Sequence, residues 1–240
     1  MSRPTSALFG WSLAVAVIAA FTGLGFWQLG RAQEKEAMLA SSAQVLAERR
    51  PLALSAAADP ARTADYDWAA GDGVFLDVPP LLLDNQTREG RAGVRVYRAF
   101  QPTAAAAPLL VELGWLPVAG DRRLPKVDRP LGPQSLSGLL AAPPSAGIAT
   151  PVAVPQGDGS LLAIGLDNAV VSTALGLPAL ATRVLKLDPA LPLGYPRDLD
   201  ILPNTLPPER HVGYAVQWFG LALAVLVTAL LLTLRRRRRR

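Results

Sequence analysis

The chain ends in ERHVGYAVQWFGLALAVLVTALLLTLRRRRRR (residues 209–240), which places the sole histidine of the sequence, an apolar run and six arginines one after another. Residues 212–234 carry no formal charge over 23 positions. At ~1.5 Å per residue, a helix of that length crosses a hydrocarbon core of roughly 30 Å. Arginines that follow such a helix favour the cytoplasmic side. The segment therefore predicts a transmembrane helix over residues 211–234 and a cytoplasmic arginine tail over residues 235–240.

A second apolar segment, LFGWSLAVAVIAAFTGLGFWQLG (residues 8–30), lies near the N-terminus and is also uncharged. A secretory signal peptide is the alternative, but its apolar region is shorter, about 7–15 residues, and the bulky residues around Trp27 make a poor cleavage site. We therefore expect an uncleaved transmembrane helix over residues 8–30, after a cytoplasmic N-terminus (residues 1–7). Because Arg3 and the arginine tail both favour the cytoplasm, residues 31–210 are expected on the periplasmic side.

The net charge of +5 comes from the two ends of the chain rather than from its middle. Arg3 and the six terminal arginines carry seven of the 24 basic charges, so residues 31–210 hold 17 basic and 19 acidic side chains, a net charge of −2. The pI near 10.1 is typical of nucleic-acid-binding proteins, but no basic face remains in the middle segment. We therefore exclude nucleic acid as a partner and expect the arginines to act in topology or on anionic membrane lipid.

The scarcity of metal-binding side chains limits the chemistry. The sequence has no cysteine, one histidine and two methionines. These numbers exclude disulfides, covalent C-x-x-C-H haem attachment, iron–sulfur clusters and thiolate copper sites, and one histidine cannot build a usual zinc site. A Ser-His-Asp triad would need His211, and no G-x-S-x-G motif accompanies it. We therefore expect no conventional hydrolase.

The middle of the chain changes from helical to strand-like patterning. Residues 31–50 keep a helical stripe until Pro51, and we interpret them as a stalk that extends the first membrane helix. Residues 66–188 show short apolar runs separated by Gly, Pro and Asp, a β-rich core that favours a small barrel or sandwich. Residues 189–210 are rich in proline and indicate an extended connector. The predicted fold class is a membrane α+β protein, in which two terminal transmembrane helices flank a β-rich, small-barrel-like periplasmic domain.

Seven strands and one short helix are expected within that domain. The strand candidates are residues 73–78, 81–86, 94–100, 109–116, 135–141, 161–166 and 182–187. The second and third of them flank the turn TREGRAG as a predicted hairpin. Residues 170–176 indicate a short helix, and residues 142–156, rich in proline and glycine, a loop or an edge excursion.

Aromatic residues gather at the outer ends of both predicted membrane helices. On the second helix, His211, Tyr214 and Trp218 fall on one face at i, i+3 and i+7. If the helices are antiparallel neighbours, Trp27 of the first helix lies near them and completes an aromatic-walled crevice. An ordinary interfacial aromatic belt is the alternative for the same residues. The position also suits an axial haem ligand, with His211 on the iron and Arg31 near the propionates, although Arg31 equally fits a snorkelling helix end.

Four segments of the chain carry a family resemblance. They are GFWQLGRAQEKEAML (residues 25–39), LLLDNQTREGRAGVRVYRAF (residues 81–100), LLVELGWLP (residues 109–117) and RHVGYAVQWFGLA (residues 210–222). In this order they resemble the W-Q-x-x-R-x-x-x-K, D-N-R-T-x-x-G-x-x-G, L-V-x-R-G-W-x-P and N-H-x-x-Y-A-x-x-W-F-x-L-A motifs of the SURF1 family, the cytochrome c oxidase assembly factors. The last motif is the most specific of the four.

The resemblance implies two membrane helices around a periplasmic or intermembrane-space domain. In bacterial relatives it implies haem a binding through the histidine that matches His211. Three positions depart from the family pattern: Gln86 and Leu113 stand where arginines are usual, and Arg210 stands where an asparagine precedes the histidine. A partner-facing or propionate-binding role of these three positions is therefore open.

Together these features predict a non-enzymatic, SURF1-like assembly factor in the bacterial inner membrane. It is expected to assist haem a delivery to, or stabilisation in, subunit I of cytochrome c oxidase, with haem A synthase as a further partner. The expected cofactor-binding residues, of which His211 is the metal ligand, are His211, Tyr214, Trp218, Trp27 and Arg31.

Two rival interpretations remain. One is a scaffold that holds oxidase subunits or haem A synthase without touching the cofactor, and the haem content of the purified protein separates it from the first interpretation. The other is a membrane-tethered enzyme that uses Asp84, Glu89 or Glu112, although the spacing of these acids on different strands predicts no specific dyad.

Overall fold

The structure is a computed structural model, and its chain forms two compact units. One unit consists of Met1–Ala40 and Thr205–Arg240, and the other of Ser41–Asn204. The described residues are 3–120, 123–147, 149–202 and 205–238. Residues 1–2 and 239–240, which belong to the two predicted cytoplasmic ends, lie outside them.

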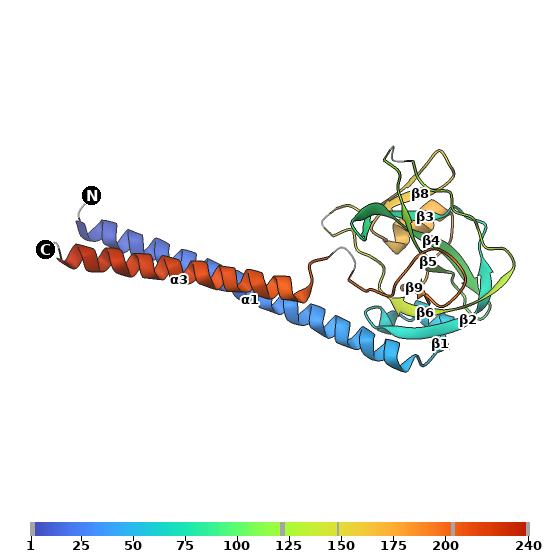
Figure 1. Cartoon of the computed structure of the whole chain (residues 1–240), viewed down its shortest axis with the longest axis horizontal. Coiled ribbons are helices and arrows are strands. Elements are labelled where there is room, and N and C mark those ends of the chain that lie inside the picture. Colours follow the sequence, from blue (N-terminus) through green and yellow to red (C-terminus); the bar gives the residue numbers. More distant parts are fainter. Residues whose placement is uncertain (1–2, 121–122, 148, 203–204, 239–240) are drawn as a thin grey trace. The chain divides into compact units, whose positions relative to one another are not determined.

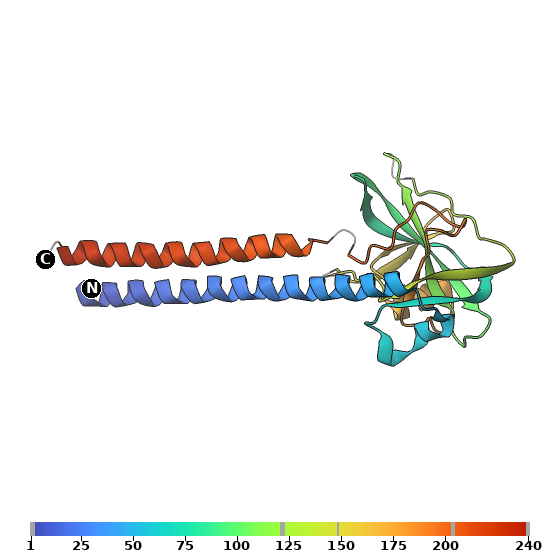
Figure 2. The same ribbon diagram turned by 60° about the horizontal axis from the view of Figure 1, so that its bottom comes forward.

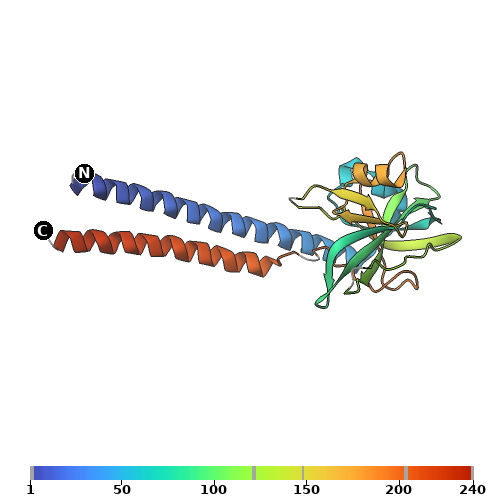
Figure 3. The same ribbon diagram turned by 90° about the horizontal axis from the view of Figure 1, so that it is seen from above.

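The first unit is built from the helix α3 (Pro208–Arg238) and from the helix α1 (Arg3–Glu48) as far as Ala40, while residues 41–48 of α1 belong to the second unit. Both are long and apolar enough to cross a membrane, by length and composition. Figures 2 and 3 show them side by side, with the start of α1 and the end of α3 at the same end of the pair. α1 continues without a break until Arg49, whose φ of 44° ends the helix. The prediction of two terminal apolar helices is confirmed, whereas their insertion in a membrane stays a prediction.

Side-chain contacts define the antiparallel register of this helix pair. Trp11 Nε1 donates a hydrogen bond to Thr233 Oγ1 at 3.1 Å near the chain ends. Towards the other end, the ring centroids of Phe26 and Phe219 are 5.3 Å apart. A Cβ atom at Gly25 would come within 2.6 Å of the Phe219 ring, so glycine permits the close approach of the two helices there.

The second unit is a strand-rich domain with a single sheet among its described residues. Its strands are β1 (Leu52–Ala53), β2 (Asp67–Phe75), β3 (Leu81–Arg88), β4 (Arg91–Pro102), β5 (Leu109–Pro117), β6 (Pro133–Ala141), β7 (Val152–Pro155), β8 (Leu161–Ile164) and β9 (Val184–Leu187). Their order in the sheet is β1-β2-β6-β9-β5-β4-β3-β8-β7. Figure 1 shows this order, from β8 through β3, β4, β5, β9, β6 and β2 to β1.

Strand β2 pairs on both of its sides and thereby joins two distant parts of the sheet. It pairs with β6 from Asp67 to Val74 and with β4 from Gly73 to Phe75, both antiparallel. The strands β2, β6, β9, β5 and β4 consequently form a closed cycle of hydrogen-bonded neighbours. Strands β3, β8 and β7 extend the sheet from β4. A Cβ atom at Gly73 would lie 2.2 Å from the Gln101 carbonyl oxygen, so only glycine fits where β2 and β4 meet.

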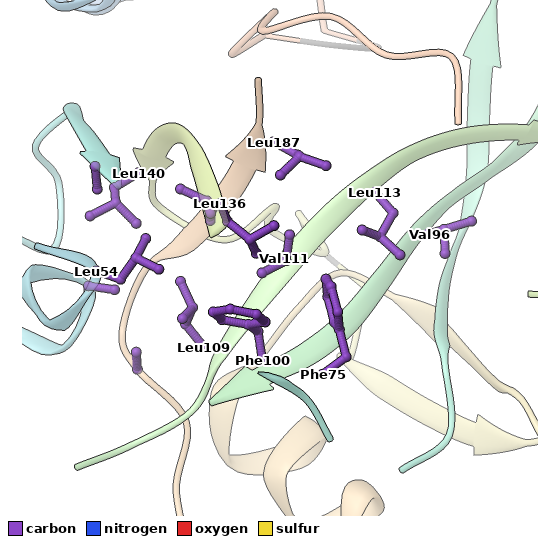
Figure 4. Close-up of a cluster of buried hydrophobic side chains, with 14 of the residues drawn as sticks. Leu54, Phe75, Val96, Phe100, Leu109, Val111, Leu113, Leu136, Leu140 and Leu187 are labelled. Carbon is purple, nitrogen blue, oxygen red and sulfur yellow. The ribbon is translucent and has the colours of Figure 1, made fainter. Parts of the chain in front are cut away.

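Apolar side chains from this cycle of strands pack into one core cluster (Figure 4). Phe75 and Phe100 meet edge to face, with ring centroids 5.0 Å apart. Leu109, Val111 and Leu113 of β5 are buried beside them. Replacing a buried Phe of this kind by Ala costs about 3–5 kcal/mol. The core therefore holds β2, β4 and β5 together and fixes the positions of the polar residues that these strands carry.

A second buried cluster lies under the helix α2 (Asn168–Leu175). Asp167 caps this helix, because its carboxylate accepts hydrogen bonds from the backbone N–H groups of Ala169 and Val170 at 3.0 Å each. Gly176, in the left-handed region at φ 67°, ends it. Val171 and Leu175 then face the cluster.

Most of the predicted strands correspond to observed ones. The candidates 81–86, 94–100 and 109–116 lie within β3, β4 and β5, and the predicted short helix overlaps α2. The prediction was wrong about the start of β2, which begins at Asp67 rather than at residue 73. It also placed no strand at β7, which pairs with β8 at the sheet edge inside the region predicted as a loop or an edge excursion.

Candidate functional site

His211 lies in the first turn of α3 and faces α1. Pro208 begins this helix, which suits the position because the missing N–H of proline needs no partner there. The side chain of His211 is directed into the helix pair, and the residue is only 8% exposed. Its Nδ1 atom is 2.6 Å from Oε1 of Gln28 on α1. The chain's sole histidine is thus held by a side chain of the other helix.

The two ring nitrogens of His211 have different surroundings. Nδ1 contacts the Gln28 carbonyl oxygen, which can only accept a hydrogen bond. Nε2 is buried and has no hydrogen-bond partner among the described residues. With Nδ1 carrying the proton, the lone pair of Nε2 is free to bind a metal ion. The atom of this site that can bind a ligand is therefore Nε2 of His211.

The residues around His211 divide into a buried face and an exposed one. Ala215 and Ala222, one and three turns along α3, are buried, and the Trp218 ring lies 5.5 Å from the Phe21 ring. Tyr214 is 41% exposed. The predicted stripe of His211 and Trp218 thus faces the other helix, with Tyr214 at its margin.

Trp27 occupies a different position from the one expected for a crevice wall. It is 57% exposed, and the aromatic partner of Trp218 is Phe21, six residues before Trp27 on α1. Antiparallel pairing alone does not bring Trp27 onto Trp218, because the side-chain direction depends on helix rotation. Its predicted role in cofactor binding remains a prediction.

Three basic residues lie at this end of the helix pair. Arg31 is half-exposed and forms an ion pair with Glu34. Lys35, one turn further along α1, is buried and donates a hydrogen bond from its ammonium group to the carbonyl oxygen of Leu206. Arg210, beside the histidine, is exposed. Lys35 is therefore the buried cation of the site, a residue that the sequence reasoning did not single out.

Gln28 and Lys35 share a sequence signal that points to the partner helix. Gln28, Ala32 and Lys35 follow one another at i, i+4 and i+7, and this spacing places them on one face of α1. Ala32 and Lys35 are buried. In the W-Q-x-x-R-x-x-x-K segment, Gln28 and Lys35 therefore lie on the face of α1 that contacts α3, whereas Arg31 lies outside that face.

The strand-rich domain carries a polar cleft of about 290 Å³. It is lined by Thr87, Arg88, Glu89, Arg95, Trp115, Asp198 and Asp200. Arg88 donates to the Asp198 carboxylate at 2.6 Å, and a guanidinium nitrogen of Arg95 lies 3.9 Å from the same carboxylate. The cations of the cleft are therefore already paired with acids of the chain itself.

A buried ion cluster lies behind this cleft. The carboxylate of Glu112 accepts hydrogen bonds from Arg95, from Tyr97 Oη at 2.9 Å and from Lys186 Nζ at 2.9 Å. Burial opposes ionisation of Glu112, but Lys186 and Arg95 outweigh it and lower the pKa of the carboxyl group. Burial and the neighbouring Glu112 raise the pKa of Tyr97 well above its ordinary value. Glu112 consequently stays charged and hydrogen-bonded to Arg95, Tyr97 and Lys186. This is the arrangement of a structural ion cluster.

The other two acids proposed for catalysis, Asp84 and Glu89, are not part of the Glu112 ion cluster. Asp84 is exposed at the irregularity within β3, and Glu89 is exposed in the β3–β4 turn at the cleft. Asp84 accepts a hydrogen bond from the backbone N–H of Asn85, whose φ is 59°. Among the described residues, no three histidine, aspartate or glutamate side chains converge to hold a metal ion.

The connector after β9 is anchored to the domain by Arg197. Its guanidinium group donates hydrogen bonds to backbone carbonyl oxygens of Leu187, Asp188, Leu191, Leu193 and Tyr195. Gly114 adopts φ 124° beside this connector, and a Cβ atom there would lie 2.5 Å from the Tyr195 carbonyl oxygen. The fixed connector places Asp198 at the cleft.

Two of the three positions that depart from the family motifs, Gln86 and Leu113, make structural contacts here. The Gln86 side chain donates to the Asp84 carbonyl oxygen at 3.0 Å. Leu113 is buried in the core, and its carbonyl oxygen accepts from the backbone N–H of Tyr195 at 2.7 Å. An apolar residue at position 113 therefore fits its surroundings.

Comparison with protein families gives a match over most of the chain. The model described as the SURF1 family matches residues 15–223. The matched region runs from α1 through the strand-rich domain into α3, and it includes Gln28, Trp115 and His211. No curated protein matches the chain.

Proposed function

Because the chain belongs to the SURF1 family, we propose that it assists the assembly of cytochrome c oxidase by delivering haem a to subunit I or by stabilising it there. Membership indicates the assembly role, since the family consists of assembly factors rather than of a class of enzymes. The haem a step goes beyond what membership of the family indicates. In this proposal the chain holds a cofactor and releases it, and it turns over no substrate.

The observation that carries the haem proposal is the unpartnered Nε2 atom of His211. A buried polar atom without a partner costs free energy, on the order of 1–3 kcal/mol, so it needs an explanation. Coordination of a haem iron by His211 would provide one, because such iron accepts a neutral imidazole nitrogen. The porphyrin would supply the other ligands of the iron, so one histidine would be sufficient. The residues present thus fit the cofactor.

Other residues of the helix pair fit secondary roles towards the same cofactor. Trp218 and Phe21 offer aromatic surface on the side of His211, and Tyr214 and Trp27 offer more exposed rings. The cations of Arg31 and Lys35 lie on α1 one and two turns beyond Gln28, where they suit propionate carboxylates. Haem a itself would supply the iron–porphyrin centre, while these side chains would bind and orient it.

The proposed location follows from the charge distribution at the ends of α1 and α3. We place both helices in a bacterial inner membrane, with the arginine tail in the cytoplasm and the strand-rich domain in the periplasm. In that arrangement His211 lies at the periplasmic side of the membrane. Subunit I and haem A synthase are then the expected protein partners, and membrane lipid surrounds the helices.

The haem content of the purified protein tests this proposal. The full chain, produced in a host that makes haem a, is extracted in mild detergent, and its haem is identified by acid extraction and chromatography. We expect haem a to copurify with the chain in near-stoichiometric amount. A haem-free protein that still supports oxidase assembly would replace the haem proposal by the scaffold interpretation.

A further inference from the structure

The hydrogen bond between Gln28 and His211 has a defined donor, Nδ1 of the imidazole, and a defined acceptor, Oε1 of the amide. We propose that Gln28 is a positioning residue, which fixes the proton of His211 on Nδ1 and so presents Nε2 as the ligand atom. The proposal rests on the proposed haem function for the identity of the ligand. The tautomer itself is a property of the chain alone.

A neutral imidazole has one hydrogen-bond donor and one acceptor. Oε1 of Gln28 lies 2.6 Å from Nδ1, a distance that requires a proton between the two atoms. If Nε2 carried the proton instead, two acceptors would face each other at this distance. The Nε2–H group would also be a buried donor without an acceptor among the described residues. Both effects act against the Nε2–H tautomer.

Packing on both helices keeps Gln28 against the ring. Ala32, one turn from Gln28, and Ala215, one turn from His211, are both buried. Their small side chains allow α1 and α3 to approach closely enough for the amide to reach the imidazole. The ring is thus held from the Nδ1 side, and its orientation does not depend on a bound ligand.

This arrangement is the one that metal-binding histidines use. Such residues donate their second ring N–H to a carboxylate, a carbonyl oxygen or a water molecule, which fixes the tautomer and raises the basicity of the ligating nitrogen. Loss of that partner typically lowers metal affinity by about 10- to 100-fold. Gln28 supplies the equivalent carbonyl oxygen from the opposite helix. A purely structural role, as a hydrogen bond between helices, is the competing explanation.

The tautomer is directly measurable because the chain has one histidine. Histidine labelled with ¹⁵N reports on His211 alone in NMR spectra of the haem-free full chain in detergent. We expect a protonated Nδ1 and a bare Nε2 in the wild type. Gln28→Leu should give a mixture of tautomers, and Gln28→Glu, which keeps an acceptor oxygen, should retain the wild-type tautomer. Gln33→Leu, at an exposed position of the same helix, is the matched control.

Haem a titration of the same variants completes the test. We expect Gln28→Leu to bind about 10- to 100-fold more weakly than wild type, and Gln33→Leu to bind like wild type. An unchanged tautomer or an unchanged haem affinity in Gln28→Leu would overturn the positioning role while wild-type binding still stands. A wild type that binds no haem a would instead overturn the proposed function, and the NMR spectra alone would then decide whether Gln28 sets the tautomer.

Discussion

The indole Nε1 of Trp115 donates a hydrogen bond to the backbone carbonyl oxygen of Gln86 at 3.2 Å. This bond connects β5 to β3 across the intervening β4. The Trp115 ring covers Gly93 of β4, where a Cβ atom would come within 2.4 Å of the ring. Since the contact uses the main chain of residue 86, it does not depend on whether that side chain is glutamine or arginine. The two motifs are therefore joined in a way that tolerates the departure at Gln86.

Removing this hydrogen bond should destabilise the strand-rich domain modestly. Trp115→Phe keeps an aromatic ring but loses the donor, so we expect the free energy of unfolding to fall by about 1 kcal/mol. Urea unfolding of the full chain in detergent, followed by circular dichroism, measures the change. Leu131→Ala, at a side chain that is 73% exposed, is the control and should change stability by less than about 0.5 kcal/mol. Equal stability of Trp115→Phe and wild type would show that the bond contributes nothing.

Removing the buried carboxylate should have a much larger effect. Glu112→Leu leaves the charges of Lys186 and Arg95 buried without their acceptor, and we expect a loss of about 3–5 kcal/mol. The double variant Glu112→Leu/Lys186→Met removes one of these charges as well and should recover part of that loss. The same unfolding experiment compares the two. A double variant that is less stable than Glu112→Leu would mean that Lys186 stabilises the domain independently of Glu112.

The same carboxyl group should make the stability of the domain depend on pH. The pKa of Glu112 is lowered in the folded chain from its ordinary 4.5, because Lys186 and Arg95 outweigh the effect of burial. Its contribution is therefore complete above the unfolded-state pKa and is lost as the pH falls through the folded-state value. We expect stability to decrease below about pH 5, with a smaller slope in Glu112→Gln. Identical slopes in the two proteins between about pH 3 and pH 6 would contradict this assignment.

The proposed topology predicts the location of both chain ends. Arg3 and the arginine tail favour the cytoplasm, so a reporter active only in the periplasm should be silent when fused after Arg240. The same reporter inserted at Gly157, in an exposed turn of the strand-rich domain, should be active. Neutral replacements of the six arginines should weaken the orientation of α3. A strong periplasmic signal from the C-terminal fusion would reverse the topology.

Sequence patterns predicted the shared face of His211 and Trp218, but they did not predict the contact of His211 with Gln28. The 3.6-residue period places His211 and Trp218 on one face of α3, because helical spacing depends on the sequence alone. Gln28 is 183 residues away from His211 in the sequence, and its contact depends on the register and rotation of two separate helices. Neither quantity can be calculated from the spacing within one helix. The i, i+4, i+7 face of Gln28, Ala32 and Lys35 was the available signal.

The fold shows a similar division between local and long-range information. Strands β4 and β5 are rich in alternating or continuous apolar residues, and their positions were predicted from that pattern. The start of β2, Trp68-Ala-Ala-Gly, lacks β-branched residues and has little strand propensity of its own. It becomes a strand because β6 pairs with it from Asp67 to Val74. Such pairing is a tertiary effect that no local window contains.

The absorption spectrum of the chain loaded with haem a, recorded for wild type and for His211→Ala, decides whether His211 binds the haem iron. His211 is at the end of a helix pair, so its replacement by alanine should remove the axial bond and leave membrane abundance unchanged. Trp218→Ala should weaken haem binding without abolishing it, because the ring contributes packing but no coordinate bond. We predict loss of the histidine-ligated haem spectrum in His211→Ala at normal abundance. An unchanged spectrum in His211→Ala, together with normal oxidase assembly, would show that His211 is not the haem ligand.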